Sequence, residues 1–239
     1  AEDMVKRTGV PIGLIPCSHG GTSMDQWSPS LKAEEGYSLY GAMVRRFHAV
    51  GGNIKGVLWY QGESDAKAKS ASEFGEKFVA FVKAVRSDFG EPNLPFYYVQ
   101  IGRNISNRDV AEWNMVQDAQ RKDEALIPNS GMVASIDLAL DDSIHINTQD
   151  LKRLGKRLSN RTCHDLFGSI SDCGQLKPGP HPVSASFEGG VVKVRFSGVN
   201  GGLQADGRIS GFTIHDASGL PAPVIYRAVI DPAEASTVR

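Results

Sequence analysis

The chain has 239 residues, a formal net charge of −1 at pH 7 and 22% charged residues. This length suits one α/β domain with a smaller appended module. The near-neutral charge argues against a protein that binds nucleic acid, because such proteins usually carry a basic excess. No apolar run approaches the ~18 residues of a membrane span, and the first three residues, Ala1 to Asp3, do not resemble a signal peptide.

The first two thirds of the sequence alternate between strand-like and helix-like segments. Apolar runs of strand length occupy residues 10–16, 53–60, 94–101 and 132–138. Apolar positions at helical spacing occupy residues 37–50, 70–89, 108–126 and 148–158. Four alternations with short connections predict a parallel sheet with right-handed crossovers and helices on both faces. We expect this α/β domain to cover residues 1–175.

The character of the sequence changes after Cys173. Residues 176–182 contain three prolines and predict a stiff, extended linker. Short strand-like segments separated by glycine-containing turns follow at residues 184–187, 191–196, 211–215 and 224–230. They predict a small antiparallel β-module over residues 183–239. A further strand begins near residue 235, so we expect the module to be incomplete.

The three cysteines divide into Cys17, within a polar motif, and the pair Cys163 and Cys173. The pair could close a short disulfide loop at the end of a helix, whereas a zinc site would need closer Cys/His pairs than His164 supplies. The pair favours a secreted or periplasmic protein.

Three polar motifs follow strand-like segments. They are CSHGGT at residues 17–22, QGESD at residues 61–65 and DSIH at residues 142–145. Ligands bind α/β sheets beyond the carboxyl ends of the strands. The three motifs are therefore expected to gather at one edge of the sheet and to form a shared site.

The pair Asp142 and His145 could supply acid–base chemistry. A carboxylate three residues before an imidazole can accept a hydrogen bond from one ring nitrogen, fix the tautomer and leave the other nitrogen as a general base. The alternative is that Asp142 caps the following helix and that His145 is an ordinary loop residue.

The other two motifs offer hydrogen-bond donors. Gly20 and Gly21 can present bare backbone N–H groups to an oxyanion, although a Gly-Gly pair is more often a simple turn. Gln61 offers a side-chain amide for the same purpose, or else bonds its own backbone. Glu63 and Asp65 could form a carboxylate pair for sugar chemistry, or belong to a structural loop.

Taken together, residues 11–22, residues 59–65 and the DSIH motif resemble the sialic-acid-specific acetylesterase family of SGNH hydrolases, in the family's order over about residues 8–160. The resemblance implies a three-layer, parallel-sheet α/β domain. It also implies hydrolysis of acetyl esters on carbohydrates by a serine nucleophile, with His145 as the general base and Asp142 as its orienting carboxylate. The tail is similar to the β-rich C-terminal part of longer bacterial members.

The resemblance implies roles for four further residues. Gly20 would give an oxyanion N–H, with Gly21 as the fallback, and Gln61 would take the role of an asparagine in other SGNH hydrolases. Glu63 would be a supporting residue that shapes its loop. An acetylated carbohydrate is the implied partner, and no metal or organic cofactor is implied.

The sequence departs from the family pattern at the nucleophile. The family's serine lies in a Gly-Gln-Ser-Asn block after the first strand, and no such block occurs in the 239 residues. Ser18 matches the oxyanion block instead. We therefore expect the first strand and the serine to lie on sequence not in this chain, on a preceding segment or a companion chain. The α/β domain would then be incomplete at its N-terminus. The alternative is an inactive relative.

Two other functions fit the same residues. A non-catalytic carbohydrate-binding protein would use Trp27, Trp59 and Tyr60 as sugar platforms. A glycosidase would use Glu63 and Asp65 as its two carboxylates.

Overall fold

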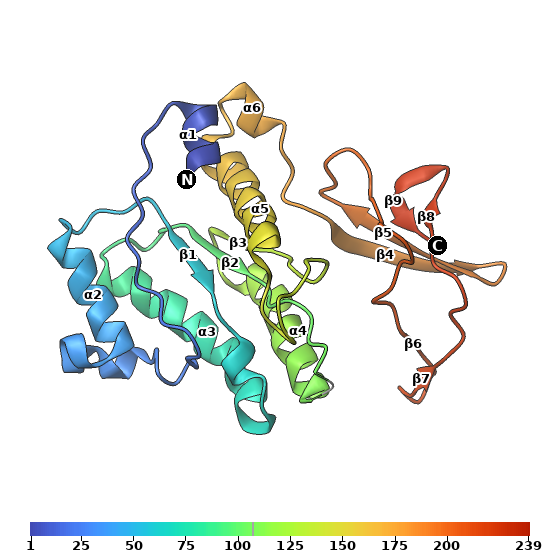
Figure 1. Cartoon of the computed structure of the whole chain (residues 1–239), viewed down its shortest axis with the longest axis horizontal. Helices are drawn as coiled ribbons and strands as arrows, with labels where there is room; N and C mark the ends of the chain where they lie inside the picture. Colours follow the sequence, from blue (N-terminus) through green and yellow to red (C-terminus); the bar gives the residue numbers. More distant parts are fainter. Residues whose placement is uncertain (107) are drawn as a thin grey trace.

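The computed structural model describes residues 1–106 and 108–239, which form an α/β domain followed by a β-module (Figure 1). The α/β domain contains α1 (Glu2–Thr8), the 3-10 helix η1 (Pro29–Tyr37), α2 (Leu39–Ala49), β1 (Val57–Tyr60), the 3-10 helix η2 (Glu63–Asp65), α3 (Ala68–Asp88), β2 (Phe96–Val99), α4 (Val110–Leu126), β3 (Ser130–Val133), α5 (Thr148–Phe167) and α6 (Ser171–Gly174). No helix among the described residues is long and apolar enough to cross a membrane.

The three strands of the α/β domain form a parallel sheet in the order β1-β2-β3. Val57 pairs with Phe96, and Phe96 pairs with Ser130, so the three strands run in step and end at one edge. All four residues of β2 are buried, as expected for a central strand that is covered on both faces.

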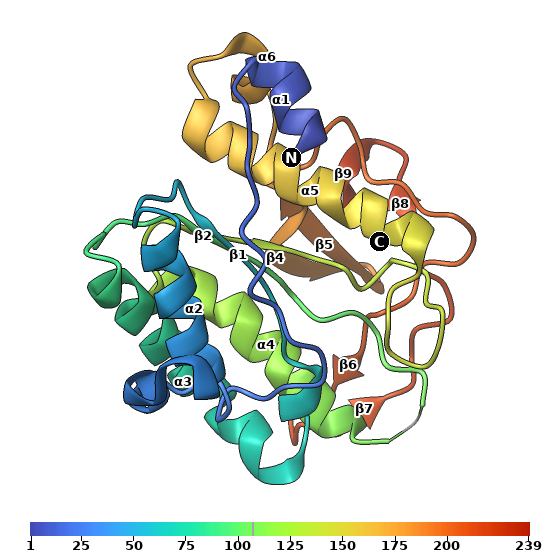
Figure 2. The same ribbon diagram turned by 60° about the vertical axis from the view of Figure 1, so that its left-hand side comes forward.

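Helices cover both faces of this sheet. On one face, α2, α3 and α4 pack around an aromatic core to which α3 contributes Phe74 and Phe81 and β2 contributes Phe96. Full burial of each phenylalanine stabilises the fold by roughly 2–3 kcal/mol. On the other face, α5 packs against Val99 and Val133, and α1 lies along α5 (Figure 2). This three-layer α/β arrangement confirms the predicted fold class.

Residues 10–16 do not form a strand, and this prediction was wrong. The segment passes β1 in an extended conformation (Figures 1 and 2) but is paired with no strand. Its Leu14 side chain is 66% exposed, and a hydrogen bond from Arg46 to the Pro16 carbonyl ties down its end. An apolar run becomes a strand only when a partner backbone is available. The parallel sheet therefore has three strands where four were predicted.

The predicted helices are present, with one difference in length. α2, α3 and α4 begin and end within two residues of the predicted bounds, whereas α5 continues nine residues past the predicted end at residue 158. The last turns of α5 bury small or polar side chains such as Ser159 and Thr162, which an apolar periodicity does not reveal. Cys163 of α5 forms a disulfide with Cys173 of α6, which is one of the arrangements that the sequence left open.

The β-module contains β4 (His181–Glu188), β5 (Val191–Ser197), β6 (Ile214–His215), β7 (Pro221–Ala222), β8 (Ile230–Asp231) and β9 (Glu234–Val238). Its main sheet has the order β4-β5-β9-β8 and is antiparallel. Gly189 and Gly190 join β4 to β5 with φ values of 57° and 80°. Positive φ at both central positions is the requirement of a type I′ hairpin turn, which favours glycine.

Three predictions about the β-module need correction. Only Ile230 of residues 224–230 belongs to a strand, and side chains such as Val224 and Tyr226 remain exposed. The predicted strand at 211–215 is reduced to Ile214–His215. The linker predicted over residues 176–182 is shorter, because β4 begins at His181.

Candidate active site

The connection between β3 and α5 (residues 134–147) holds the DSIH motif and is anchored at both ends. Leu138 and Ile146 are buried against α5, and a β-bridge joins Leu140 to Ile146. The Asn147 side chain accepts a hydrogen bond from the Asp150 N–H at 2.8 Å and thereby caps α5. Since Asn147 is the cap, the alternative that Asp142 caps this helix is wrong.

Asp142 and His145 are joined at the tip of this connection. His145 Nδ1 lies 2.7 Å from Asp142 Oδ2, and Asp142 Oδ1 accepts hydrogen bonds of 2.8 Å from the backbone N–H groups of Ile144 and His145. The Ile144 N–H, followed by the imidazole and the His145 N–H, lowers the pKa of Asp142 to about 2.

The charge of Asp142 determines how the imidazole is protonated. An ionised carboxylate only accepts hydrogen bonds, so Nδ1 of His145 carries a proton and the neutral ring keeps its lone pair on Nε2. The His145 side chain is 67% exposed and can be reached by a substrate. The pair therefore has the arrangement of a general base with its orienting carboxylate.

Gln61 connects the first motif to the second. Its side chain is 7% exposed, and Nε2 donates to the Thr22 carbonyl at 2.9 Å and to Asp65 Oδ2 at 2.5 Å. The reversed amide would place an oxygen against two acceptors, which selects the present orientation. Both amide hydrogens are thus engaged inside the protein. The oxyanion role of Gln61 stays a prediction that requires one of them to be released.

Asp65 lies beneath the site and is fully buried. It accepts hydrogen bonds from Gln61 and from the Met24 N–H at 2.9 Å, and burial raises its pKa. A sugar cannot reach this carboxylate, so the glycosidase reading with Glu63 and Asp65 as a working pair is wrong. Met24 was missed by sequence reasoning, because it lies 41 residues away and has no polar side chain.

Glu63 begins η2, the 3-10 helix that follows β1. Burial raises its pKa, while the backbone N–H of Glu63, a hydrogen bond from the Tyr60 hydroxyl and the electrostatic influence of His145 oppose that rise. The carboxylate therefore lies within electrostatic range of the imidazole. Gly62 makes this turn with φ 154°, and a Cβ there would lie 2.7 Å from Ile101 Cγ2. Only glycine fits this position.

Gly20 and Gly21 lie on an exposed turn at the same sheet edge. Thr22 closes this turn by donating from its hydroxyl to the His19 carbonyl at 2.9 Å, and its carbonyl accepts from Gln61. Apart from their chain neighbours, no heavy atom of the described residues lies within 4 Å of a Cβ placed on either glycine, so there is open space beside this turn. Their assignment to the oxyanion hole stays a prediction.

The three aromatic residues named as sugar platforms have different environments. Trp27 is buried and donates from Nε1 to the Thr22 hydroxyl at 2.9 Å, so its assignment as a platform is wrong. Trp59 packs edge-on against Trp27 in the core, and Tyr60 is exposed. Among the described residues, no group of three His, Cys, Asp or Glu side chains is placed to hold a metal ion.

Comparisons with known proteins find relatives of this chain among carbohydrate esterases. A probable carbohydrate esterase of Arabidopsis thaliana is 35% identical over 153 residues, covering 62% of this chain and 54% of that protein. Human sialate O-acetylesterase is 29% identical over 163 residues, covering 56% of this chain and 31% of that protein. The crystal structure of a carbohydrate acetylesterase from Xanthomonas citri matches all of this chain and 54% of its own, with 28% identity and a TM-score of 0.79.

The chain spans about half or less of the length of these relatives. A model of the family described as carbohydrate esterase, sialic acid-specific acetylesterase, matches residues 1–164, which include all three motifs. This chain therefore belongs to the sialic acid-specific acetylesterase family of carbohydrate esterases.

Proposed function

We propose that this chain is the part of a carbohydrate O-acetylesterase that carries the general base, and that the nucleophilic serine lies on sequence outside these 239 residues. The observation that carries the proposal is the hydrogen-bonded pair of Asp142 and His145 at the carboxyl edge of the sheet. Family membership supports an acetyl ester of a sugar, of the sialate or xylan type, as the substrate.

The geometry suits acyl transfer in two steps. His145 Nε2 takes the proton of the serine hydroxyl as its oxygen attacks the acetyl carbonyl, and returns that proton to the departing sugar oxygen. Water then attacks the acetyl-enzyme with the same base, and acetate and the free serine are released. The Asp142 carboxylate stabilises the imidazolium that forms in both steps.

The free edge of the sheet supports the placement of the serine. Within the described part of the chain, β1 pairs only with β2, and Leu58 of β1 is 53% exposed. A strand added in parallel along β1 would end beside Gln61, at the same sheet edge from which the connection with the DSIH motif emerges. Among the described serines, none hydrogen-bonds the imidazole of His145. None of the described serines thus serves as a nucleophile for Asp142 and His145, and a strand added along β1 could supply one.

Labelling with a serine-reactive fluorophosphonate, followed by intact mass and peptide mapping, tests the placement of the serine. A labelled peptide from outside these 239 residues would support the proposal. A label on Ser18 or on any other serine of this chain would contradict the placement while leaving an esterase. No label and no release of acetate from acetylated sugars would overturn the proposed activity in favour of an inactive relative.

Substitutions of the pair test the roles of its members. His145→Gln should lower the release of acetate at least about 10³-fold, because no base remains, and Asp142→Asn should lower it by about 10²–10⁴-fold, because the wrong tautomer is favoured. Acetate is measured in the active protein that contains this chain. His215→Gln, in the β-module, is the control and should leave the rate unchanged. A rate of the His145 variant equal to the wild type would sink the proposal.

We also propose that the protein works outside the cytosol, in a secreted or periplasmic setting. The disulfide between Cys163 and Cys173 supports this, since such bonds persist in oxidising compartments. Alkylation of the protein taken from its native compartment without reductant should modify Cys17 alone. Modification of all three cysteines would contradict the proposal.

A further inference from the structure

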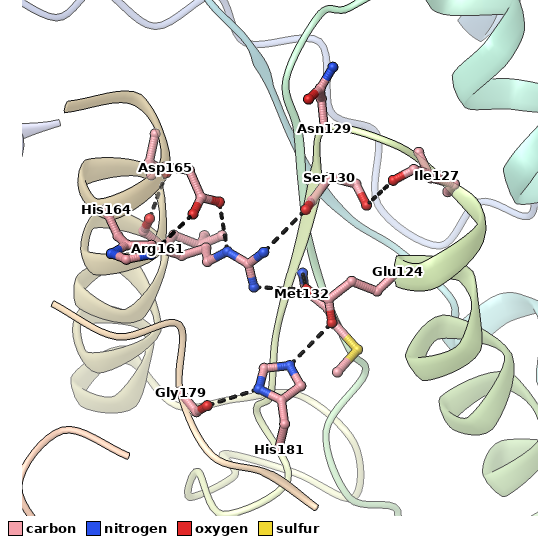
Figure 3. Close-up of polar contacts among 12 residues, drawn as sticks. Glu124, Ile127, Asn129, Ser130, Met132, Arg161, His164, Asp165, Gly179 and His181 are labelled. Carbon is pink, nitrogen blue, oxygen red and sulfur yellow. Dashed lines mark hydrogen bonds and ion pairs between the residues drawn. The ribbon is translucent and has the colours of Figure 1, made fainter. Parts of the chain in front are cut away.

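His181, the first residue of β4, faces the α/β domain at its junction with the β-module (Figure 3). Its Nε2 atom lies 3.2 Å from Glu124 Oε2, in the last turn of α4, and its Nδ1 atom lies 2.8 Å from the Gly179 carbonyl oxygen. Glu124 Oε1 accepts from Arg161 Nη1 of α5 at 2.7 Å and from the Met132 N–H at 3.2 Å. The Glu124 carboxylate of α4 thus makes hydrogen bonds with α5, with β3 and with the β-module.

Both ring nitrogens of His181 face atoms that only accept hydrogen bonds. A carbonyl oxygen carries no hydrogen, and Glu124 is ionised because the charge of Arg161 and a backbone N–H stabilise its anion. Both contacts are satisfied only when each nitrogen carries a proton, that is, when the ring is an imidazolium. A neutral ring would turn one lone pair toward an oxygen atom.

This contact is also the only hydrogen bond or ion pair found among the described residues between residues 1–175 and residues 181–239. The linker is bonded to the module instead, through Lys177 with Asn200 and through Gly179 with Gly198. The β-module lies beside the α/β domain and is connected to it by an extended chain after α6 (Figure 1). This ion pair is therefore the polar contact that holds the β-module against the α/β domain.

The other charged groups around the contact come from α5. Arg161 divides its positive charge between Glu124 and Asp165, to which its Nε donates at 2.7 Å, and His164 lies 3.9 Å from Asp165. The hydrogen bond with Glu124 raises the pKa of His181, and its burial and Arg161 oppose that rise.

We propose that protonation of His181 docks the β-module onto the α/β domain and that the module is released to its tether as the pH rises. A raised pKa in the folded state means that this contact contributes fully below the ordinary histidine pKa of 6.5 and is lost as the pH rises through the raised value. Burial alone would raise the pKa of Glu124, but the hydrogen bond from His181 lowers it. The stabilisation that comes from ionised Glu124 is therefore present above pH 4.5 and is lost as the pH falls through the lowered pKa. Docking is strongest at mildly acidic pH.

The radius of gyration of the whole chain, measured by X-ray scattering at pH 5.5 and pH 8.5, tests the proposal. The ratio of released to docked molecules should rise about tenfold between these pH values for each unit by which the pKa of His181 exceeds 6.5. The radius of gyration should increase in parallel, while far-UV circular dichroism stays constant.

Two variants separate docking from folding. His181→Gln cannot carry the charge and should lose the pH response of the radius of gyration, and Glu124→Gln should lose it from the other side of the contact. His215→Gln, in the same β-module, should keep the wild-type response. An equal radius of gyration of the wild type at both pH values would overturn the proposal, and so would a wild-type pH response in the His181 variant.

Discussion

Asp123 of α4 is a buried carboxyl group without a visible function. It is 3% exposed, its Oδ2 atom has no hydrogen-bond partner among the described residues, and a Cβ on Gly75 of α3 would lie 3.3 Å from its Oδ1 atom. Burial raises its pKa to about 7. The folded protein therefore holds a proton here that the unfolded chain releases near pH 4.

Asp123→Asn should stabilise the protein in alkaline solution. In the wild type, Asp123 lowers the free energy of unfolding as the pH rises from about 4 to about 7, because only the folded state must either keep the proton or bury the charged carboxylate. The loss amounts to about 4 kcal/mol at most. The variant keeps a neutral side chain and avoids this loss. Urea denaturation at pH 4 and pH 8 checks the prediction. A gain of equal size at both pH values would contradict the assigned pKa.

The contact between Asp142 and His145 could be predicted from the sequence, whereas the environment of Gln61 could not. Asp142 and His145 lie three residues apart on one turn, so local geometry brings them together. Gln61 donates to the Thr22 carbonyl, 39 residues away. Every residue carries a backbone carbonyl, so the sequence does not show which one Gln61 bonds. A side chain that looks like a free donor in sequence is thus held by the fold.

Two helical glycines should respond to alanine in opposite ways. Gly155 of α5 has no heavy atom within 4 Å of an added Cβ, so Gly155→Ala should stabilise the protein by about 0.5–1 kcal/mol through helix propensity. In Gly41→Ala of α2, the added Cβ would lie 2.8 Å from the Cα and N atoms of Glu35. Backbone atoms cannot swing aside, so this variant should lose stability. Thermal unfolding compares the two, and a stabilised Gly41 variant would contradict the packing.

The strands and helices were predictable where periodicity reports burial, and not elsewhere. α3 shows its buried face through phenylalanines, and its bounds were found to within two residues. Residues 10–16 have the composition of a strand, but a strand is defined by its neighbour, and composition does not show whether a neighbour is present. The sequence indicated only the start of β9, because the buried residues of this strand include the polar Thr237.

The disulfide determines where the chain leaves the α/β domain. Cys163 and Cys173 are both fully buried and close a loop of about ten residues before the linker. Reduction, or Cys173→Ser, should lower the free energy of unfolding by about 3 kcal/mol, because the unfolded chain regains the freedom of the loop. Cys17→Ser, which touches no disulfide, should change nothing. Denaturation with and without reductant checks this, and equal midpoints would contradict it.

The family was recognisable from three short motifs, but the arrangement of the two parts of the molecule was not. The motifs retain their order and lie at the carboxyl edge of one sheet, as expected for an α/β fold. The contact of His181 with Glu124 spans 57 positions and joins the first residue of β4 to the last turn of α4. A histidine between prolines gives no sign of such a partner, so the junction emerges only from the structure.

The parallel pairing of β1, β2 and β3 also sets the order in which the molecule folds. Val57 and Phe96 are separated by the whole of α3, whereas Glu188 and Val191 meet across two glycines. Hairpins close in about 1–10 μs, but partners that are distant along the chain must first overcome the entropy of closing a long loop. During refolding, the β4–β5 hairpin and the Asp142–His145 turn should therefore appear before the sheet. Local geometry therefore brings Asp142 and His145 together early in folding, and the sheet edge that surrounds them forms in the slowest step.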